Sequence, residues 1–341
     1  MSPRDGVYPQ HLVRAMPKAE LHVHLEGTVD AATLMTLAER HGVQPPADDI
    51  EGVDAWYRFD GFEQFLERYF RVLGLLRESD DFAFIAEQYL ARAHAQGVVH
   101  VEFHVSACGH IAENGREWVP IHDAIVAGCT AAERTSGISW ALIPDISPHL
   151  PAPVCAEAME QVFAHDLTHV AAIGMGGPAD NWFTDDFTPI YRRATAEGLH
   201  AVAHAAEHGG PDEVRFALEQ FGVERIQHGI GVMSDPDVVQ LLVDREVACD
   251  VCPGSNLALA AVAAPETHPL PAMLDAGITV TLGSDDPPMF QTSLLDEYER
   301  AWEWCDLDAE GLRRLATNSL RASFAPRDRV DRWIEQLASS E

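Results

Sequence analysis

Two histidines, His22 and His24, lie near the amino terminus in the segment Glu20-Leu21-His22-Val23-His24-Leu25-Glu26. Aliphatic neighbours favour a buried β-strand, in which residues two apart point to the same side. Both imidazoles would then face one point, which is how a strand presents two nitrogens to a metal ion. Two core histidines that alternate by chance are the alternative, so this pair alone does not decide between a metal site and packing.

Histidine and aspartate also stand where three later strands are predicted to end. These residues are His204, His228 and the pair Asp285-Asp286. Core packing would favour Val, Leu or Ala at such positions. In a parallel α/β barrel the carboxyl ends of all strands meet at one face, where catalytic groups collect. This convergence favours a metal site at the His-x-His strand over chance packing.

Three of these imidazoles and one carboxylate make a ligand set that leaves a position for water. This is the pattern of a catalytic zinc site rather than a closed structural site. Zinc lowers the pKa of bound water to ~7, which makes hydroxide available at neutral pH. The imidazole-rich set favours zinc, with Fe(II), Mn(II) and Co(II) as alternatives. The predicted ligands are His22, His24, His204 and Asp285.

A carboxyl group follows closely on the third predicted ligand. Glu207 lies three residues after His204, in His-Ala-Ala-Glu-His-Gly-Gly, and can lean over the metal as a general acid/base. A glutamate in the first turn of a helix is the alternative. His228, in Gln227-His228-Gly229, could orient the attacking hydroxide, with a satisfied core histidine as the alternative.

Short runs rich in Val and Ile alternate with segments of helical periodicity along the chain. Residues 61–73 have apolar side chains at i, i+3 and i+4, which predicts an amphipathic helix. Predicted helices at 211–221, 236–243 and 271–276 open at Pro, a favoured first-turn residue. The strands predicted after the His-x-His strand are 98–105, 138–144, 169–175, 200–203, 225–228, 247–252 and 278–282.

Eight strands, each followed by helix-compatible sequence, predict a TIM-type (β/α)8 barrel. A doubly wound open sheet is the alternative, but no Gly-rich phosphate fingerprint follows an early strand. Residues from about 30 to 77 are predicted as a helical insertion after strand 1, and residues 292–341 as C-terminal helices. Since no repeat or linker interrupts the pattern, residues 1–341 are predicted to form a single domain.

The charge balance restricts the partners of the chain. Its 341 residues include 23 Lys and Arg against 54 Asp and Glu, a formal net charge of −31. Without a basic stripe, binding to nucleic acid or to anionic membranes is not expected. The expected partners are small neutral or cationic molecules and metal ions.

Residue usage argues against several other classes of protein. Lys18 is the only lysine and precedes the first strand, which disfavours Schiff-base and pyridoxal-phosphate chemistry. The six cysteines are too sparse and irregular for a disulfide framework. The amino terminus lacks the apolar core of a signal peptide, so a soluble, cytoplasmic protein is expected.

One apparent metal motif is rejected. His100-Val101-Glu102 with Cys249-Asp250-Val251-Cys252 superficially matches the zinc signature of cytidine-type deaminases. Ala248 stands where that signature has proline, and the barrel pattern conflicts with that fold. Both cysteines are interpreted as packing residues.

Five segments together resemble the adenosine/adenine deaminase family of the amidohydrolase superfamily. They occur in the family's order and span most of the chain. The segments are 17–28 (PKAELHVHLEGT), 204–207 (HAAE), 225–229 (RIQHG), 252–256 (CPGSN) and 284–287 (SDDP).

The resemblance implies a barrel with one zinc on the four predicted ligands and a hydroxide that attacks the amine-bearing C6 of a purine. Glu207 would protonate N1 of the purine, while His228 and Asp285 would handle the hydroxide proton. Asp286 would bind N7, and Gly177 lies where the family's N3-binding glycine is found. Ammonia would leave from a tetrahedral intermediate.

The departures from the family pattern concern the substrate. Ala206, Gln227 and Gly283 replace residues common in the family near the site. Glu26 occupies the position where typical adenosine deaminases carry an Asp that meets the ribose, and members acting on free adenine also tend to carry Glu there. The Gly-Gly-Pro at 176–178 resembles the aminodeoxyfutalosine deaminase branch, although a tight turn explains the same residues.

The leading expectation is a zinc-dependent hydrolytic deaminase of a 6-aminopurine nucleoside, adenosine or an adenosine-like derivative. Alternatives are deamination of free adenine or of aminodeoxyfutalosine, and an amidohydrolase reaction on a non-purine substrate. A non-catalytic binding relative is disfavoured because every ligand and the acid are present. Phe62 and Phe65 on the inserted helix could form an apolar lid over the substrate, but helical spacing also suits core packing.

Overall fold

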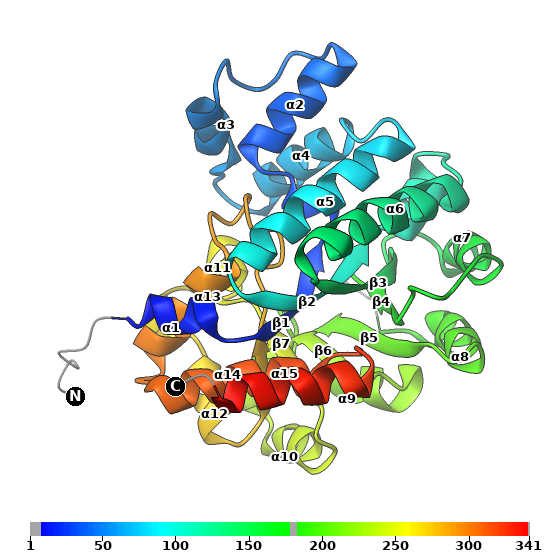
Figure 1. Ribbon diagram of the computed structural model, residues 1–341. Coiled ribbons are helices and arrows are strands. Elements are labelled where there is room, and N and C mark those ends of the chain that lie inside the picture. Colours follow the sequence, from blue (N-terminus) through cyan, green and yellow to red (C-terminus); the bar gives the residue numbers. More distant parts are fainter. Residues whose placement is uncertain (1–7, 178–182, 340–341) are drawn as a thin grey trace.

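The fold is a closed barrel of eight parallel strands surrounded by helices, in a computed structural model that describes residues 8–177 and 183–339 (Figure 1). The strands follow the order of the sequence around the barrel, and every neighbouring pair is parallel. The bounds are β1 Lys18–His24, β2 Val98–Val105, β3 Ser139–Ile146, β4 Ala172–Met175, β5 His200–Ala205, β6 Arg225–His228, β7 Ala248–Val251 and β8 Thr279–Leu282. The predicted (β/α)8 barrel is therefore confirmed.

The barrel closes between the end of β1 and the residues that follow β8. The His24 N–H donates to the carbonyl of Asp285 at 3.0 Å, and the Asp285 N–H donates to the carbonyl of His22 at 3.1 Å. Two of the predicted ligand positions are thereby joined by main-chain hydrogen bonds. Strand closure itself brings the His-x-His segment beside the Asp285 segment.

Helices connect the strands, and two groups of them lie outside the regular alternation. α2, α3 and α4 stand together beyond the barrel at the top of Figure 1, and they form the predicted insertion. The helices are α1 Gln10–Ala15, α2 Ala31–His41, α3 Ile50–Tyr57, α4 Phe62–Leu73, α5 Ser79–Ala95, α6 Trp118–Ser136, α7 Ala152–Phe163, α8 Thr188–Ala196, α9 Pro211–Phe216, α10 Pro236–Asp244, α11 Pro253–Ala258, α12 Leu270–Asp275, α13 Leu294–Trp304, α14 Ala309–Ala322 and α15 Arg327–Ser339. The helix predicted over 211–221 continues from α9 into a single π-helical turn, Ala217–Phe221.

The C-terminal helices cover the end of the barrel opposite to the predicted site. In α14, the Ser319 hydroxyl accepts a hydrogen bond from the Ala19 N–H at the start of β1. Just after α14, the Phe324 ring lies 4.5 Å from the Arg225 guanidinium at the start of β6. This end of the barrel is therefore sealed, which leaves the carboxyl ends of the strands for chemistry.

An ion network, rather than an apolar plug, fills part of the barrel interior. Arg225 Nη2 lies 2.6 Å from Glu102 Oε2, and its Nε lies 2.5 Å from Asp250 Oδ2, with all three side chains buried. Glu102 belongs to the rejected His100-Val101-Glu102 motif. Its carboxylate forms a buried ion pair with Arg225, which is a structural role. Buried charges are tolerated only when paired in this way.

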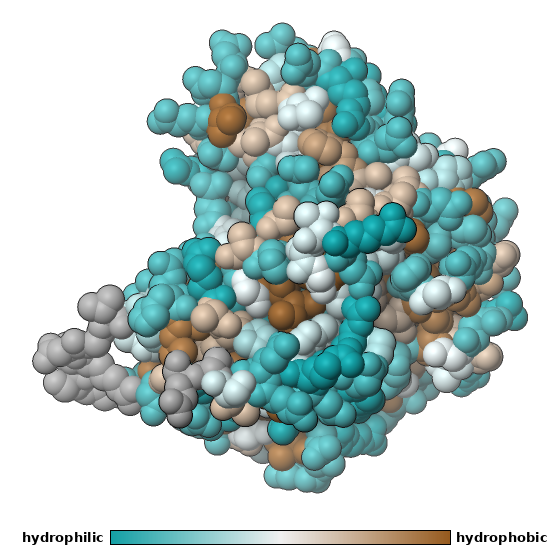
Figure 2. Space-filling view, viewed as in Figure 1, coloured by the Kyte–Doolittle hydropathy of each residue, from teal (hydrophilic) through white to brown (hydrophobic). Residues whose placement is uncertain are grey.

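Hydrophilic side chains cover most of the face shown in Figure 2, with small separate hydrophobic areas between them. Among the described residues, none of the helices combines the length and the apolar character that crossing a membrane requires.

Candidate active site

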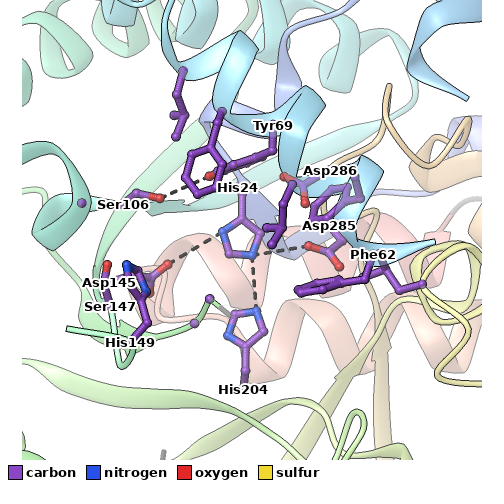
Figure 3. Close-up of a pocket in the computed structure, with 18 of the residues that line it drawn as sticks. His24, Phe62, Tyr69, Ser106, Asp145, Ser147, His149, His204, Asp285 and Asp286 are labelled. Carbon is purple, nitrogen blue, oxygen red and sulfur yellow. Dashed lines mark hydrogen bonds and ion pairs between the residues drawn. The ribbon is translucent and has the colours of Figure 1, made fainter. Parts of the chain in front are cut away.

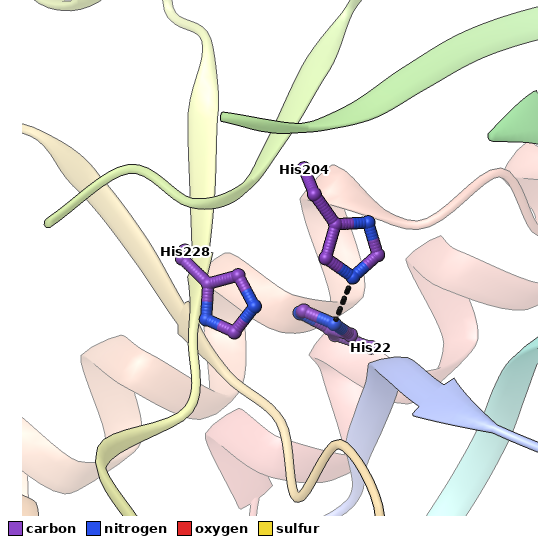
Figure 4. A group of neighbouring side chains, drawn as sticks. All are labelled: His22, His204 and His228. Atoms are coloured by element: carbon purple, nitrogen blue, oxygen red, sulfur yellow. Dashed lines mark hydrogen bonds between the residues drawn. The ribbon is translucent and has the colours of Figure 1, made fainter. Parts of the chain in front are cut away.

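The imidazoles of His22, His24 and His204 meet at the carboxyl ends of β1 and β5 (Figures 3 and 4). The Nε2 atoms of His22 and His204 are 3.1 Å apart, and those of His24 and His204 are 3.3 Å apart. Asp285 Oδ1 lies 3.4 Å from His24 Nε2 and 3.8 Å from His22 Nε2. Four predicted ligand atoms from three parts of the chain thus surround one point.

The hydrogen bonds behind two of these rings show that the point suits a cation. His22 Nδ1 lies 3.2 Å from the Asp250 carbonyl, and His204 Nδ1 lies 2.8 Å from the Met175 carbonyl. A carbonyl only accepts, so each ring carries its proton on Nδ1 and directs the lone pair of Nε2 inward. Two lone pairs held 3.1 Å apart repel each other unless a positive charge lies between them. The donor set therefore fits a divalent metal.

Burial keeps these imidazoles in the neutral form that binds metals. It holds the pKa values of His22 and His24 well below the usual range and lowers the pKa of His204 to about 3. Asp285 is held from the other side, where the Ser255 hydroxyl donates to its Oδ2 at 2.6 Å.

Three residues of the site have left-handed backbone conformations, which residues other than glycine rarely adopt. Ala206 has φ 52°, His228 has φ 63° and Asp285 has φ 61°, each at the carboxyl end of a strand. Such conformations cost roughly 1–3 kcal/mol and persist where the surrounding structure enforces them. Here they stand directly at or beside Glu207, His228 and Asp285, all of which line the cavity.

Glu207 and His228 lie side by side next to the metal-binding point. His228 Nε2 is 3.6 Å from Glu207 Oε2 and 3.9 Å from Asp285 Oδ2. Burial, together with the Asp285 carboxylate, raises the pKa of Glu207 to about 8. Such a carboxyl group keeps its proton at neutral pH and can give it to a substrate.

A cavity of about 960 Å³ opens over this group of side chains. One wall is the α4 helix, which contributes mainly apolar and aromatic side chains. Figure 3 shows Tyr69 on the opposite side of His24 from His204, and Phe62 to one side, near Asp285. The α4 residues that line the cavity are Phe62, Phe65, Leu66, Tyr69, Phe70 and Leu73.

The structure brings most of the predicted substrate-binding residues to this cavity. Phe62, Phe65, Gly177 and Asp286 all line it. Phe65 also stacks on Phe290 with 5.2 Å between ring centroids, so this residue serves packing as well as the wall. Asp286 Oδ1 is buried without a hydrogen-bond partner among the described residues.

Glu26 is placed differently from the other predicted residues. β1 ends at His24 and a 3₁₀ turn begins at Glu26, so the alternation of the strand does not continue to this residue. Glu26 is fully buried, and its Oε1 accepts hydrogen bonds from the Ser106 N–H at 2.9 Å and from His110 Nε2 at 2.8 Å. Ser106 and His110 line the cavity, and Glu26 lies behind them.

Comparison with known proteins identifies the family. A family model described as adenosine deaminase matches residues 17–340. The chain belongs to the adenosine deaminase family. Relatives named adenine deaminase are 34% identical over 331 residues in Rhodospirillum rubrum (96% of this chain, 97% of the relative) and 36% identical over 320 residues in Streptomyces coelicolor (94% of each).

Solved structures agree with this membership of the adenosine deaminase family. Adenine deaminase from Arthrobacter aurescens superposes with a TM-score of 0.89 at 34% identity, covering 95% of this chain and 98% of that one. An amidohydrolase from Burkholderia ambifaria with bound zinc gives 0.87 at 26% identity, covering 99% and 94%. The protein is thus a hydrolytic deaminase that acts on a C–N bond, as enzymes of this amidohydrolase family are.

The expectation of a nucleoside substrate is wrong. Relatives between 31% and 36% identical over most of the chain are named adenine deaminase, as is the solved Arthrobacter aurescens structure. That expectation rested on the fold, and a fold shared across a family does not determine which member of a substrate class is bound. Glu26 was the residue that pointed to the free base.

Several residues that contact the site have no role in the sequence-based prediction. Asp145 follows directly on a predicted strand, and its Oδ2 lies 3.8 Å from His24 Nδ1 while His104 Nδ1 lies 2.9 Å from its Oδ1. A polar residue at a strand end is the same signal that identified Asp285. Ser255 and Asn256 lie within the matched CPGSN segment, but nothing in their spacing predicts which side chains they would contact.

Proposed function

We propose that this protein is a zinc-dependent adenine deaminase that converts free adenine to hypoxanthine and ammonia. The observation that carries the proposal is the similarity over nearly the whole chain to proteins named adenine deaminase. It is supported by the convergence of three imidazoles, one carboxylate and a protonated glutamate at one cavity.

The metal would be held by His22, His24, His204 and Asp285, whose donor atoms already face one point. Three nitrogens and one oxygen with neutral imidazoles are a donor set that zinc prefers. When bound, the metal supplies Lewis acidity and an activated water as the nucleophile.

The side chains of the protein supply the remaining steps. Glu207, protonated because of its burial, would donate its proton to N1 of the base and so prepare C6 for attack. Asp286 would hold N7. Burial and the neighbouring Asp285 raise the pKa of Asp286 well above the usual range, so it would donate a hydrogen bond through a buried carboxyl group. His228 would contact the attacking oxygen from its position beside Glu207 and Asp285.

The walls of the cavity would position the base. Phe62 and Phe65 from α4 would cover one side of it, and Gly177 would allow a close approach on another because it carries no side chain. Glu26 would set the preference for the free base, because Ser106 and His110 bind its Oε1 while its buried Oε2 has no partner among the described residues. The imidazole ring of free adenine carries an N–H where a nucleoside carries its sugar. A buried carboxylate accepts a hydrogen bond from that N–H and is left unpaired when a sugar replaces the hydrogen.

The test is a comparison of adenine and adenosine with the purified, zinc-loaded protein. The rates of both substrates are measured by ammonia release and by loss of aminopurine absorbance. The kcat/KM for adenine should exceed that for adenosine by ~10⁴-fold, the scale on which a site that binds a substrate N–H rejects an analogue that lacks it. Turnover of adenosine at an equal or greater kcat/KM, or no ammonia from adenine, would contradict the proposal.

A further inference from the structure

We propose that His268, which does not line the cavity, is a positioning residue that sets which nitrogen of His228 carries the proton. This inference rests on the proposed function, because His228 is a catalytic residue only in that reaction. A series of buried hydrogen bonds, here called the tautomer network, links His268 to His228. It comprises the backbone N–H of Leu270 and the side chains of His268, Asn256 and His228.

The network starts from a donor whose direction is certain. The backbone N–H of Leu270 donates to His268 Nδ1 at 3.1 Å. A backbone N–H cannot accept, so Nδ1 of His268 must offer its lone pair. His268 is buried, which favours the neutral ring, and a neutral ring with an accepting Nδ1 carries its proton on Nε2. His268 is therefore a donor through Nε2.

The orientation of the Asn256 amide follows from that proton. His268 Nε2 lies 3.3 Å from Asn256 Oδ1, so the amide oxygen accepts and the amide nitrogen faces the other way. Asn256 Nδ2 lies 3.1 Å from His228 Nδ1 and donates to it. Turning the amide over would place N–H against N–H at His268, which is unfavourable in a buried site.

The last step assigns the tautomer of His228. Since Nδ1 accepts from Asn256, the proton of the neutral ring must be on Nε2. This nitrogen faces Glu207 Oε2 at 3.6 Å and Asp285 Oδ2 at 3.9 Å, and the ring lies next to the His22–His204 pair in Figure 4. His228 thus presents an N–H, not a lone pair, toward the reacting oxygen.

The Asn256 amide also lies near the proposed acid, where it lowers the pKa of Glu207 against the larger opposing effect of burial. The buried Asn256 amide therefore orients His228, and His268 determines which way that amide faces. His268 is itself held in place by the ring of Trp304, with 5.2 Å between ring centroids. In this account His228 stabilises the developing negative charge on oxygen as a hydrogen-bond donor and does not act as the base.

The direct test is the tautomer of His228 in the zinc-loaded protein, measured by proton–nitrogen correlation NMR on protein labelled with nitrogen-15 in its histidines. The signal of His228 is assigned by its loss in His228→Gln. We expect the Nε2–H form in the wild-type protein. The Nδ1–H form would overturn the inference whether or not the protein deaminates adenine, so this readout is independent of the proposed function.

Two substitutions test whether the network controls that tautomer. His268→Phe removes both hydrogen bonds but keeps a ring beside Trp304, and His268→Gln keeps a donor and an acceptor. His268→Phe should lower kcat for adenine by ~10–100-fold, the range for an outer partner of a functional side chain, with KM and zinc content unchanged. His268→Gln should recover most of that loss.

Asn256→Asp should move the proton of His228 to Nδ1, because a carboxylate only accepts, and should lower kcat by ~10²–10³, as for loss of an oriented donor. His122→Phe is the matched control, since His122 is also buried beside a tryptophan, Trp118, and contacts the exposed Asp123. It should leave kcat and the His228 signal unchanged. Unchanged kcat and tautomer in His268→Phe, or equal losses in the control, would overturn the inference.

Discussion

Replacing Glu207 with glutamine tests the proposed acid most sharply. The substitution keeps the size and most of the hydrogen-bonding capacity of the side chain but removes the transferable proton. Glu207 lies 3.6 Å from His228 and lines the cavity, so the change acts at the reacting centre. The metal ligands are untouched, and zinc content should therefore equal that of the wild-type protein.

The structure sets the expected magnitude. With a pKa of about 8, Glu207 is about 90% protonated at pH 7, whereas an ordinary glutamate with a pKa of 4.5 is about 0.3% protonated. Burial thus increases the population of the acid form by about 300-fold at neutral pH. Loss of a positioned general acid costs ~10²–10⁴ in rate, and we expect kcat of Glu207→Gln to fall within that range.

The pH dependence follows from the same group. Because Glu207 must carry its proton to act, the rate should fall as the pH rises through the pKa of this side chain. A bound cation lowers that pKa, so the decline should begin at or below pH 8.

The assay is ammonia release from adenine between pH 6 and pH 10, with metal content measured on each sample. Glu224→Gln, a change at a surface glutamate paired with His200, is the control and should match the wild-type protein. A kcat for Glu207→Gln within tenfold of the wild-type value at equal zinc content would refute the role of Glu207 as the acid.

Three further predictions concern the metal and stability. Chelation should abolish activity and lower the melting temperature, and one equivalent of zinc per chain should restore both, because a ligand that binds only the folded state stabilises it; activity that survives complete chelation would contradict this. Arg225→Met should lower the free energy of unfolding by about 3–5 kcal/mol in chemical denaturation, since it leaves Glu102 and Asp250 buried without their cation; a loss below 1 kcal/mol would show that the network is dispensable. Burial lowers the pKa of His268 from 6.5 to about 4, so between these pH values the unfolded chain binds a proton that the folded chain does not. The free energy of unfolding should therefore fall as the pH decreases from 6.5 to 4, by at most about 3 kcal/mol. His268→Phe should remove this part of the pH dependence, and an unchanged slope of the free energy against pH would contradict the assignment.

The order of the strands and the convergence of the four predicted ligands could be predicted from the sequence because both follow from strong local signals. Alternation of apolar runs with helical segments predicts the barrel, and the carboxyl ends of its strands must meet at one face. His22, His24, His204 and Asp285 needed only to be placed at strand ends to be brought together.

The partners behind the site could not be predicted in this way. Asn256 contacts His228 and His268 because a short helix follows β7 and turns the amide inward, and no periodicity in the sequence encodes that direction. Strand alternation would bring Glu26 to the face of His22 and His24, but β1 ends two residues earlier, and this end is set by the packing around it. The reaction class followed from the motifs of the family, whereas the preference for a nucleoside rested on the fold, which does not determine the substrate.

A zinc titration of the metal-free protein, with adenine as the substrate, tests the metal requirement and the choice of base together. We expect the rate of ammonia release to rise linearly and to reach a plateau at one zinc per chain. Adenosine under the same conditions should release ammonia far more slowly. Ammonia release from adenine that does not depend on added metal, or none at one zinc per chain, would contradict the proposed function.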